Sequence, residues 1–142
     1  IVPSGPGAGG AFVFLQRWVH DLARFHAQSV EDQERTIGRT KPDSVELDDA
    51  AKPPTAHIAR VVIEEDGEEL EIYRRSTAYG TVAEQGLQFI AFTNDLDIID
   101  AMLARMFGLT DDGLHDRLTD FTTPVTGAYY FAPAIESLAT LG

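Results

Sequence analysis

The 142-residue chain contains no cysteine, which excludes disulfide bonds, thiolate-bound zinc, iron–sulfur clusters and thiolate-ligated haem. A bound metal must therefore take its ligands from His, Asp, Glu, Tyr or Met. The chain also lacks a signal peptide and an apolar run of 18 residues, so we expect a soluble, cytoplasmic protein with no membrane partner. Serine-hydrolase, glycine-rich phosphate-binding and zinc-protease motifs are absent as well, which leaves the common hydrolase and nucleotide functions without support.

Basic residues are scarce, with 11 Lys and Arg against 23 Asp and Glu and a formal net charge of −12. Such a surface repels phosphate backbones, so we expect no nucleic-acid partner. It could attract cations such as Mn²⁺, although an acidic surface more often serves solubility. The hydrophobic share of 44% is that of a folded protein, and the length is that of one domain.

The order of the expected elements predicts the fold class. Residues 1–10 are rich in glycine and form an expected flexible leading segment, and 11–142 form the expected domain. The chain opens at Ile1 without a methionine, so we expect it to be part of a longer protein. Apolar runs, helix caps and turn residues predict the following elements: strands over 11–18, 86–92 and 127–132, helices over 19–27, 29–38 and 95–107, a long loop over 38–56, and a hairpin turn at Asp66-Gly67 between strands 61–63 and 70–73. This βαββαβ order is typical of an α+β, ferredoxin-like sandwich with an antiparallel sheet.

The four histidines differ in their value as metal ligands. His20 and His26 lie on different faces of the expected helix, and His115 lies in a polar loop where hydration is the usual state. His57 follows Pro53-Pro54 and begins an apolar segment. It is the best candidate ligand, although a lone histidine of this kind more often has a structural role.

Two arginine clusters flank His57. Arg39 follows an expected helix end, where a basic residue ordinarily complements the helix dipole. Arg74 and Arg75 lie on an expected strand, so their side chains should alternate and one should point inward. An inward arginine needs an anionic partner, which could be a ligand or one of the many carboxylates.

Six clusters, taken in order, resemble the dye-decolorizing peroxidases, and most closely their bacterial B-type. They are Ile37–Lys41, Asp43–Asp49, Pro53–His57, Tyr73–Ser76 with Tyr79-Gly80, Leu87–Phe92 and Val125–Pro133. The likeness covers nearly the whole chain and corresponds to the C-terminal half of such an enzyme. The family's G-x-x-D-G motif is absent from this chain.

The resemblance implies a haem-dependent peroxidase. The family has two ferredoxin-like halves, binds haem b mainly in the second, and uses hydrogen peroxide to oxidise dyes, phenolics and, in some members, Mn²⁺ through a ferryl intermediate. The implied partners are hydrogen peroxide, bulky organic reductants, the N-terminal half that carries the distal aspartate, and further copies of the chain in a homo-oligomer. A protein nanocompartment in the cytoplasm is an alternative location, although no targeting tail is evident after Leu141.

Carried over residue by residue, the resemblance gives each candidate a role. The roles are His57 as axial ligand of the haem iron, Arg74 as the catalytic distal arginine, Arg39 as a propionate partner, Ser76 and Phe89 as further haem contacts, and Asp120 as the carboxylate that hydrogen-bonds the other nitrogen of His57. Ser76 stands where B-type relatives often have asparagine. Electrons from large reductants could pass through aromatic residues, with core packing as the alternative for each: Trp18, Tyr73, Tyr129 and Tyr130.

Two other functions stay open at this point. One is a non-enzymatic haem-binding or assembly module that lacks the distal aspartate. The other is a ferredoxin-like domain that binds no haem and uses its arginines in salt bridges.

Overall fold

The computed structural model describes residues 1–140. Leu141 and Gly142, the last two residues of the domain expected over 11–142, lie outside the described residues, and so does the position after Leu141 where no targeting tail was expected. The chain divides into two compact units. Unit 1 comprises Ile1–Val19, Glu71–Asp100 and Pro124–Gly142, and unit 2 comprises His20–Leu70 and Ala101–Thr123. Each unit is therefore built from segments that are far apart in the sequence.

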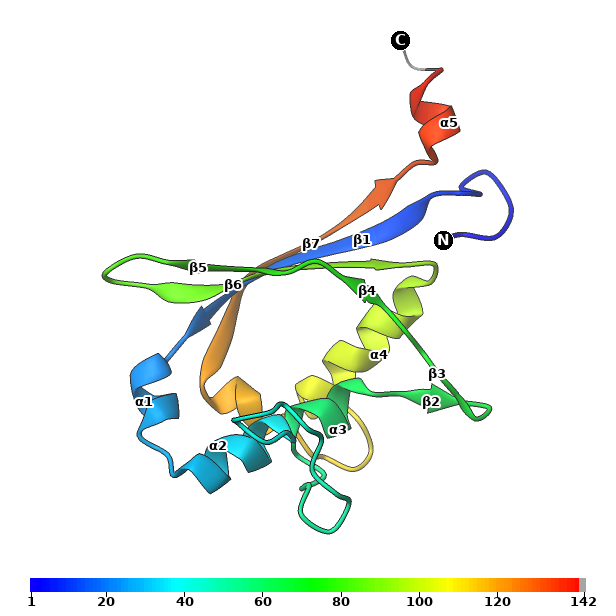
Figure 1. Ribbon diagram of the computed structural model, residues 1–142. Helices are drawn as coiled ribbons and strands as arrows, with labels where there is room; N and C mark the ends of the chain where they lie inside the picture. Colours follow the sequence, from blue (N-terminus) through cyan, green and yellow to red (C-terminus); the bar gives the residue numbers. More distant parts are fainter. Residues whose placement is uncertain (141–142) are drawn as a thin grey trace. The chain divides into compact units, whose positions relative to one another are not determined.

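Most of unit 1 is an antiparallel sheet (Figure 1). Its strands are β1 (Ala11–His20), β4 (Tyr73–Arg74), β5 (Thr77–Gly80), β6 (Gln85–Thr93) and β7 (Thr122–Ala132). The strand order is β4-β6-β1-β7, and β5 also pairs with β6. β1 and β6 pair from Phe12↔Thr93 to Val19↔Gly86. The two long central strands thus give the sheet its register.

The residues of β1 alternate between a buried and a more open face, as a strand in a half-covered sheet requires. Phe14, Gln16 and Trp18 are all buried. Gly86 on β6 has no room for a side chain, because a Cβ there would lie 1.9 Å from the backbone oxygen of Trp18. The close approach of β6 to β1 therefore depends on glycine at this position.

An aromatic cluster lies on the same sheet. The Phe14 ring lies 4.9 Å from the ring of Tyr129 and 6.2 Å from that of Phe89. The Tyr129 hydroxyl donates to Asp100 Oδ1 at 2.5 Å. Partial burial is the largest cause, and this hydrogen bond the second, of a rise in the pKa of Tyr129 to about 12. Tyr129 is thus held in its protonated form, with a carboxylate as the acceptor of its proton.

The helices and the remaining short strands complete the two units. They are α1 (Leu22–His26), α2 (Val30–Ile37), α3 (His57–Val61), β2 (Glu64–Glu65), β3 (Glu68–Glu69) and the 3₁₀ helix η1 (Arg117–Asp120) in unit 2, α5 (Ile135–Leu138) in unit 1, and α4 (Leu96–Met106), which begins in unit 1 and ends in unit 2. The element order and the antiparallel sheet confirm the predicted α+β, ferredoxin-like class. No helix among residues 1–140 is both long and apolar enough to cross a bilayer.

The helix expected over 19–27 is wrong at its start. β1 continues to His20 because Val19 pairs with Gly86, and sheet pairing outweighs the helical pattern there. The helix begins only at Leu22, after Asp21 accepts a hydrogen bond from the backbone N–H of Arg24. Asp21 is therefore the helix N-cap that the sequence pattern did not reveal.

The hairpin was predicted at the right turn but with the wrong strands. Asp66 and Gly67 both have positive φ angles, of 53° and 83°, as a tight hairpin turn requires. The paired residues are those of β2 and β3, whereas Val61 ends helix α3 and Tyr73 belongs to β4. The final strand also starts earlier than expected, at Thr122.

Candidate functional site

His57 and Asp116 form a hydrogen-bonded pair in unit 2. His57 is the first residue of α3, and the extended backbone of Ala56 before it starts the helix at this point. The Nδ1 atom of His57 lies 2.6 Å from Oδ2 of Asp116. Asp116 is fully buried, and its other oxygen accepts from the backbone N–H of Leu118 at 2.8 Å. A buried carboxylate accepts, so Nδ1 of the neutral imidazole carries the proton and donates it.

This pairing leaves Nε2 of His57 with a lone pair. The His57 side chain is 24% exposed, and within residues 1–140 no hydrogen bond to Nε2 is present. The same described residues contain no group of three or more His, Asp or Glu that could hold a metal ion. A single imidazole, fixed through its other nitrogen by a carboxylate, suits a metal whose other ligands come with a cofactor, as in haem.

The carboxylate predicted to support His57, Asp120, is the wrong one. Asp120 is half-exposed at the end of η1 and lies 3.1 Å from Nε2 of His115. Asp116 is instead turned inward, because its backbone N–H donates to the oxygen of Met106 at 2.9 Å. The sequence pattern did not single out Asp116, and the signal that could have found it is its role as N-cap of η1.

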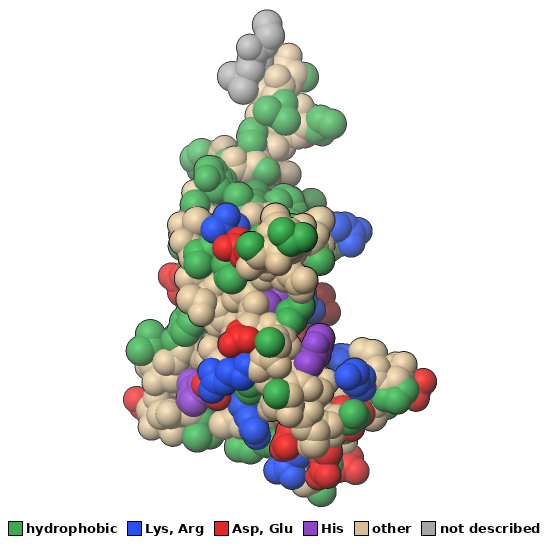
Figure 2. Space-filling view, turned by 90° about the vertical axis from the view of Figure 1, so that its left-hand side faces the viewer, with side chains coloured by type: hydrophobic (Ala, Val, Ile, Leu, Met, Phe, Trp, Pro, Cys, Tyr) green, Lys and Arg blue, Asp and Glu red, His purple; other side chains and the backbone are tan. Residues whose placement is uncertain are grey.

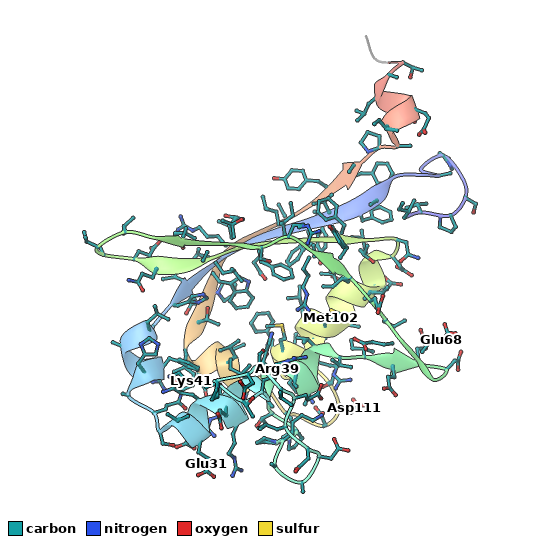
Figure 3. The ribbon with its side chains drawn as sticks, viewed as in Figure 1. Glu31, Arg39, Lys41, Glu68, Met102 and Asp111 are labelled. Atoms are coloured by element: carbon teal, nitrogen blue, oxygen red, sulfur yellow. The ribbon has the colours of Figure 1, made fainter. Side chains whose placement is uncertain are left out.

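Arg39, the predicted propionate partner, also belongs to unit 2. It follows Gly38, whose φ of +93° ends α2 as predicted, and its Nη1 donates to the backbone oxygen of Ser44 at 2.9 Å. Arg39 and Lys41, both labelled in Figure 3, line a cavity of about 190 Å³ together with residues of α1 and α2. Basic side chains in such a cavity can bind an anionic group.

The other predicted site residues, Arg74, Ser76 and Phe89, belong to unit 1. Arg74 lies on β4 opposite Ala91 of β6 and is exposed. Within residues 1–140 its side chain has no ion-pair or hydrogen-bond partner. Ser76 is exposed after β4, and Phe89 is half-buried on β6. The charge of Arg74 is thus available for a ligand.

The expectation that Arg74 or Arg75 points into an apolar interior is wrong. Both are exposed, because Arg74 ends the two-residue strand β4 at the edge of the sheet and Arg75 directly follows it. The guanidinium of Arg75 lies over the ring of Tyr73 at 4.4 Å. Arg75 thus has an aromatic partner, whereas within residues 1–140 no aromatic ring lies against the guanidinium of Arg74.

Comparison with known protein families identifies the family of this chain. The family model described as "Dyp-type peroxidase, C-terminal" matches residues 2–137. The chain belongs to this family. The resemblance to the dye-decolorizing peroxidases, expected from the sequence clusters, is thereby confirmed.

Individual Dyp-type relatives are similar over most of this chain. A dye-decolorizing peroxidase of Mycobacterium tuberculosis is 42% identical over 134 residues, which are 92% of this chain and 40% of that protein. A DypB variant of Rhodococcus jostii RHA1 in complex with haem has a TM-score of 0.90 and 40% identity over 96% of this chain and 45% of the other. The encapsulated DyP-type peroxidase of Mycobacterium smegmatis has a TM-score of 0.88 and 41% identity over 92% and 43%. The chain therefore spans less than half the length of these relatives.

Proposed function

We propose that this chain is the haem-binding part of a peroxidase that uses hydrogen peroxide to oxidise bulky organic compounds such as dyes and phenolics. The observation that carries the proposal is the His57–Asp116 pair, which presents one imidazole nitrogen and holds the other at 2.6 Å from a buried carboxylate. The haem complex of the Rhodococcus DypB variant supports haem as the cofactor. Haem b is the form that we propose.

Each candidate residue of this chain has its own role in the proposed haem site. His57 would bind the iron through Nε2, and Asp116 would keep the imidazole oriented and electron-rich by accepting the Nδ1 proton. Arg39 would pair with a propionate, and Ser76 and Phe89 would contact the macrocycle. Haem supplies the redox-active iron at which peroxide is reduced.

The N-terminal half of the family is the proposed protein partner. Exposed apolar side chains of β7 and α5 are available for such a contact, and Figure 2 shows hydrophobic side chains in the upper part of the view. The exposed large apolar residues of β7 and α5 are Val125, Tyr129, Tyr130, Phe131, Ile135 and Leu138. Exposed apolar side chains are typical of a protein contact surface, which supports the proposed contact.

Three further expectations become part of the proposal. We propose that bulky reductants and Mn²⁺ donate electrons through exposed aromatic residues; Tyr73 is exposed and lies outside the surface proposed for the N-terminal half, Tyr129 and Tyr130 belong to that surface, and Trp18 is buried. The encapsulated Mycobacterium smegmatis relative supports a nanocompartment as the location. A homo-oligomer stays a prediction.

Titration of the chain with haemin tests the proposal. We expect a Soret band that saturates at one haem per chain, followed by peroxide-dependent oxidation of an anthraquinone dye once the N-terminal half is supplied. Haem binding without dye oxidation in that reconstituted protein would favour the non-enzymatic haem module. A titration without saturation would contradict both functions.

Arg74→Leu is expected to slow the reaction of the haem-loaded protein with peroxide by about 100-fold, while haem stays bound. A guanidinium near bound peroxide stabilises the negative charge on the departing oxygen, and loss of one such group typically costs 10²–10³ in rate. Stopped-flow mixing with peroxide measures this rate. Arg75→Leu is the matched control, because Arg75 directly follows Arg74 in the chain but its guanidinium packs on the ring of Tyr73. An equal loss in both variants would move the role away from Arg74.

A further inference from the structure

A buried arginine joins the helix of His57 to the segment that carries Asp116. Arg60 lies on α3 about one helical turn after His57, so the two side chains lie on the same side of the helix. The Arg60 side chain is only 3% exposed. Its Nη1 donates to Oδ2 of Asp112 at 2.7 Å, and its Nε donates to the backbone oxygen of Arg105 at 3.1 Å. Arg60 thus contacts both the end of α4 and the loop that follows it.

The carboxylate of Asp112 forms hydrogen bonds both with this guanidinium and with other residues of the loop. Arg60 Nη2 donates to Oγ1 of Thr110 at 3.1 Å and to Oδ1 of Asp112 at 3.3 Å. The same Oδ1 accepts from the Thr110 hydroxyl at 2.8 Å and from the backbone N–H of Leu114 at 3.0 Å. The bond from Arg60, aided by those from Thr110 and Leu114, holds the pKa of Asp112 well below its usual range. The contact is therefore an ion pair at neutral pH.

The second arginine of this cluster makes the reciprocal contact. Arg105, near the end of α4, donates from Nη2 to the backbone oxygen of Ala59 at 2.7 Å. The side chain of Arg60 binds the backbone of Arg105, and the side chain of Arg105 binds the backbone beside Arg60. Two guanidinium groups thus fasten α3 to the end of α4.

The loop that Arg60 binds ends at Asp116. Phe107 and His115 form a β-bridge at its base, and the backbone N–H of Asp116 donates to the oxygen of Met106. A shift of the loop relative to α3 would therefore change the distance between Asp116 and His57.

The segment that precedes His57 is also hydrogen-bonded to the segment that carries Asp116. The backbone N–H of Arg117 donates to the oxygen of Thr55 at 2.9 Å. Helix α3 has only five residues and no side-chain cap, and a helix this short is not stable by itself. The position of α3 must therefore come from contacts with other segments on both sides of His57. Before His57 the contact is made by Thr55, and after His57 it is made by Arg60.

We propose that Arg60 is a positioning residue for His57. By locking α3 to the 107–116 loop, it holds the Nδ1–H of His57 within hydrogen-bond distance of Asp116 and so aims Nε2 at the metal. This inference rests on the proposed haem function and deepens it, because it names the residue that keeps the axial ligand in place. A guanidinium that only stabilised the fold would leave the His57–Asp116 bond unchanged in any variant that still folds.

The first test uses the haem-free full chain with ¹⁵N-labelled histidine at pH 8. A hydrogen bond to a buried carboxylate protects the Nδ1 proton of His57 from exchange with water, and its NMR signal is assigned by its loss in His57→Ala. We expect Arg60→Met to speed the exchange of this proton at least tenfold or to remove its signal. Arg35→Met is the matched control, because Arg35 is an exposed arginine of α2 in the same unit.

The second test uses the haem-loaded chain. Resonance Raman spectra of the ferrous form report the iron–histidine stretch, which falls when the imidazole loses its hydrogen bond to a carboxylate. We expect this frequency to fall in Arg60→Met and to stay unchanged in Arg35→Met. Asp112→Asn is a second, milder variant, since its side chain is 45% exposed and keeps its shape while the ion pair is lost.

Each outcome decides between the two roles of Arg60. Faster proton exchange and a lower stretching frequency, with an unchanged far-UV circular dichroism spectrum, support the positioning role. Wild-type exchange and frequency in a folded Arg60→Met overturn it. If Arg60→Met does not fold, Asp112→Asn gives the same two readouts. Failure of the wild-type chain to bind haem would contradict the proposed function alone, because the NMR test needs no haem.

Discussion

A His57→Ala chain is expected to lose its one-to-one haem-binding site. Nε2 of His57 is the nitrogen that the proposal assigns to the iron, and residues 1–140 contain no cluster of three or more acidic or histidine side chains that could hold a metal instead. Loss of a group that merely supports a metal ligand typically weakens binding 10–100-fold. We therefore expect loss of the ligand itself to weaken haem binding by at least about 100-fold.

The same substitution is expected to destabilise the fold. Asp116 is fully buried and would lose the imidazole that donates to it. An unsatisfied buried group costs about 1–3 kcal/mol. Urea unfolding of the haem-free chain measures this cost, and a haemin titration followed at the Soret band measures the affinity. Imidazole added to the buffer can enter the space left by the side chain, and we expect it to restore part of the haem binding.

His115→Ala is the control for His57→Ala. His115 is the histidine next to Asp116 in the chain, but its half-exposed ring pairs with the half-exposed Asp120. Hydration replaces such a contact at little cost, so haem affinity and stability should stay close to wild type. If His57→Ala kept the axial-histidine spectrum and His115→Ala lost it, the ligand would be His115.

Local signals made part of this structure predictable from the sequence. Helix α2 lies where Ser29 and Gly38 indicated, because the serine hydroxyl accepts from the backbone N–H of Asp32 and the glycine adopts a positive φ. The turn at Asp66-Gly67 was predicted for the same kind of reason. Each of these features depends on residues within a few positions of one another.

Features that depend on distant contacts were not predictable in this way. Val19 and His20 have a helical pattern but belong to β1, since the pairing partner of Val19 lies far along the chain at Gly86. The strand predicted over 61–63 is also wrong, since Val61 ends helix α3, where Arg60 and Arg105 bind each other's backbone segments. Nothing local to either segment reveals these partners.

In the candidate site, too, local features could be predicted from the sequence and features that depend on distant contacts could not. His57 could be chosen from the sequence because it follows two prolines and because its cluster resembles that of a known family. The choice between Asp116 and Asp120 could not be made, since both are carboxylates in a polar stretch. The bond from the Asp116 backbone to Met106 decides it, and that bond depends on where α4 ends.

Asp116→Asn is expected to impair haem binding although asparagine has nearly the shape of aspartate. Both carboxylate oxygens accept, one from Nδ1–H of His57 at 2.6 Å and one from the N–H of Leu118 at 2.8 Å. An amide has one acceptor and one donor, so one of these two N–H groups must face an NH₂ group. If the NH₂ faces His57, the imidazole takes its proton on Nε2, and the lone pair that should bind iron is lost.

The expected size of the Asp116→Asn effect follows from this clash. We expect haem affinity to fall about 10–100-fold, as for other supporting groups of metal ligands. The free energy of unfolding should fall by about 1–3 kcal/mol, because a buried donor is left without an acceptor. Haemin titration and urea unfolding measure the two quantities, and the iron–histidine stretch of any haem that still binds should be lowered.

Asp120→Asn is the matched control, since it makes the same chemical change in a carboxylate only four positions away that is half-exposed and contacts His115. We expect its haem affinity and its stability to stay close to wild type, because water can satisfy the new amide. The comparison decides which carboxylate supports the axial histidine. A large loss in Asp120→Asn together with a silent Asp116→Asn would overturn the assignment of Asp116 and restore the one that the sequence suggested.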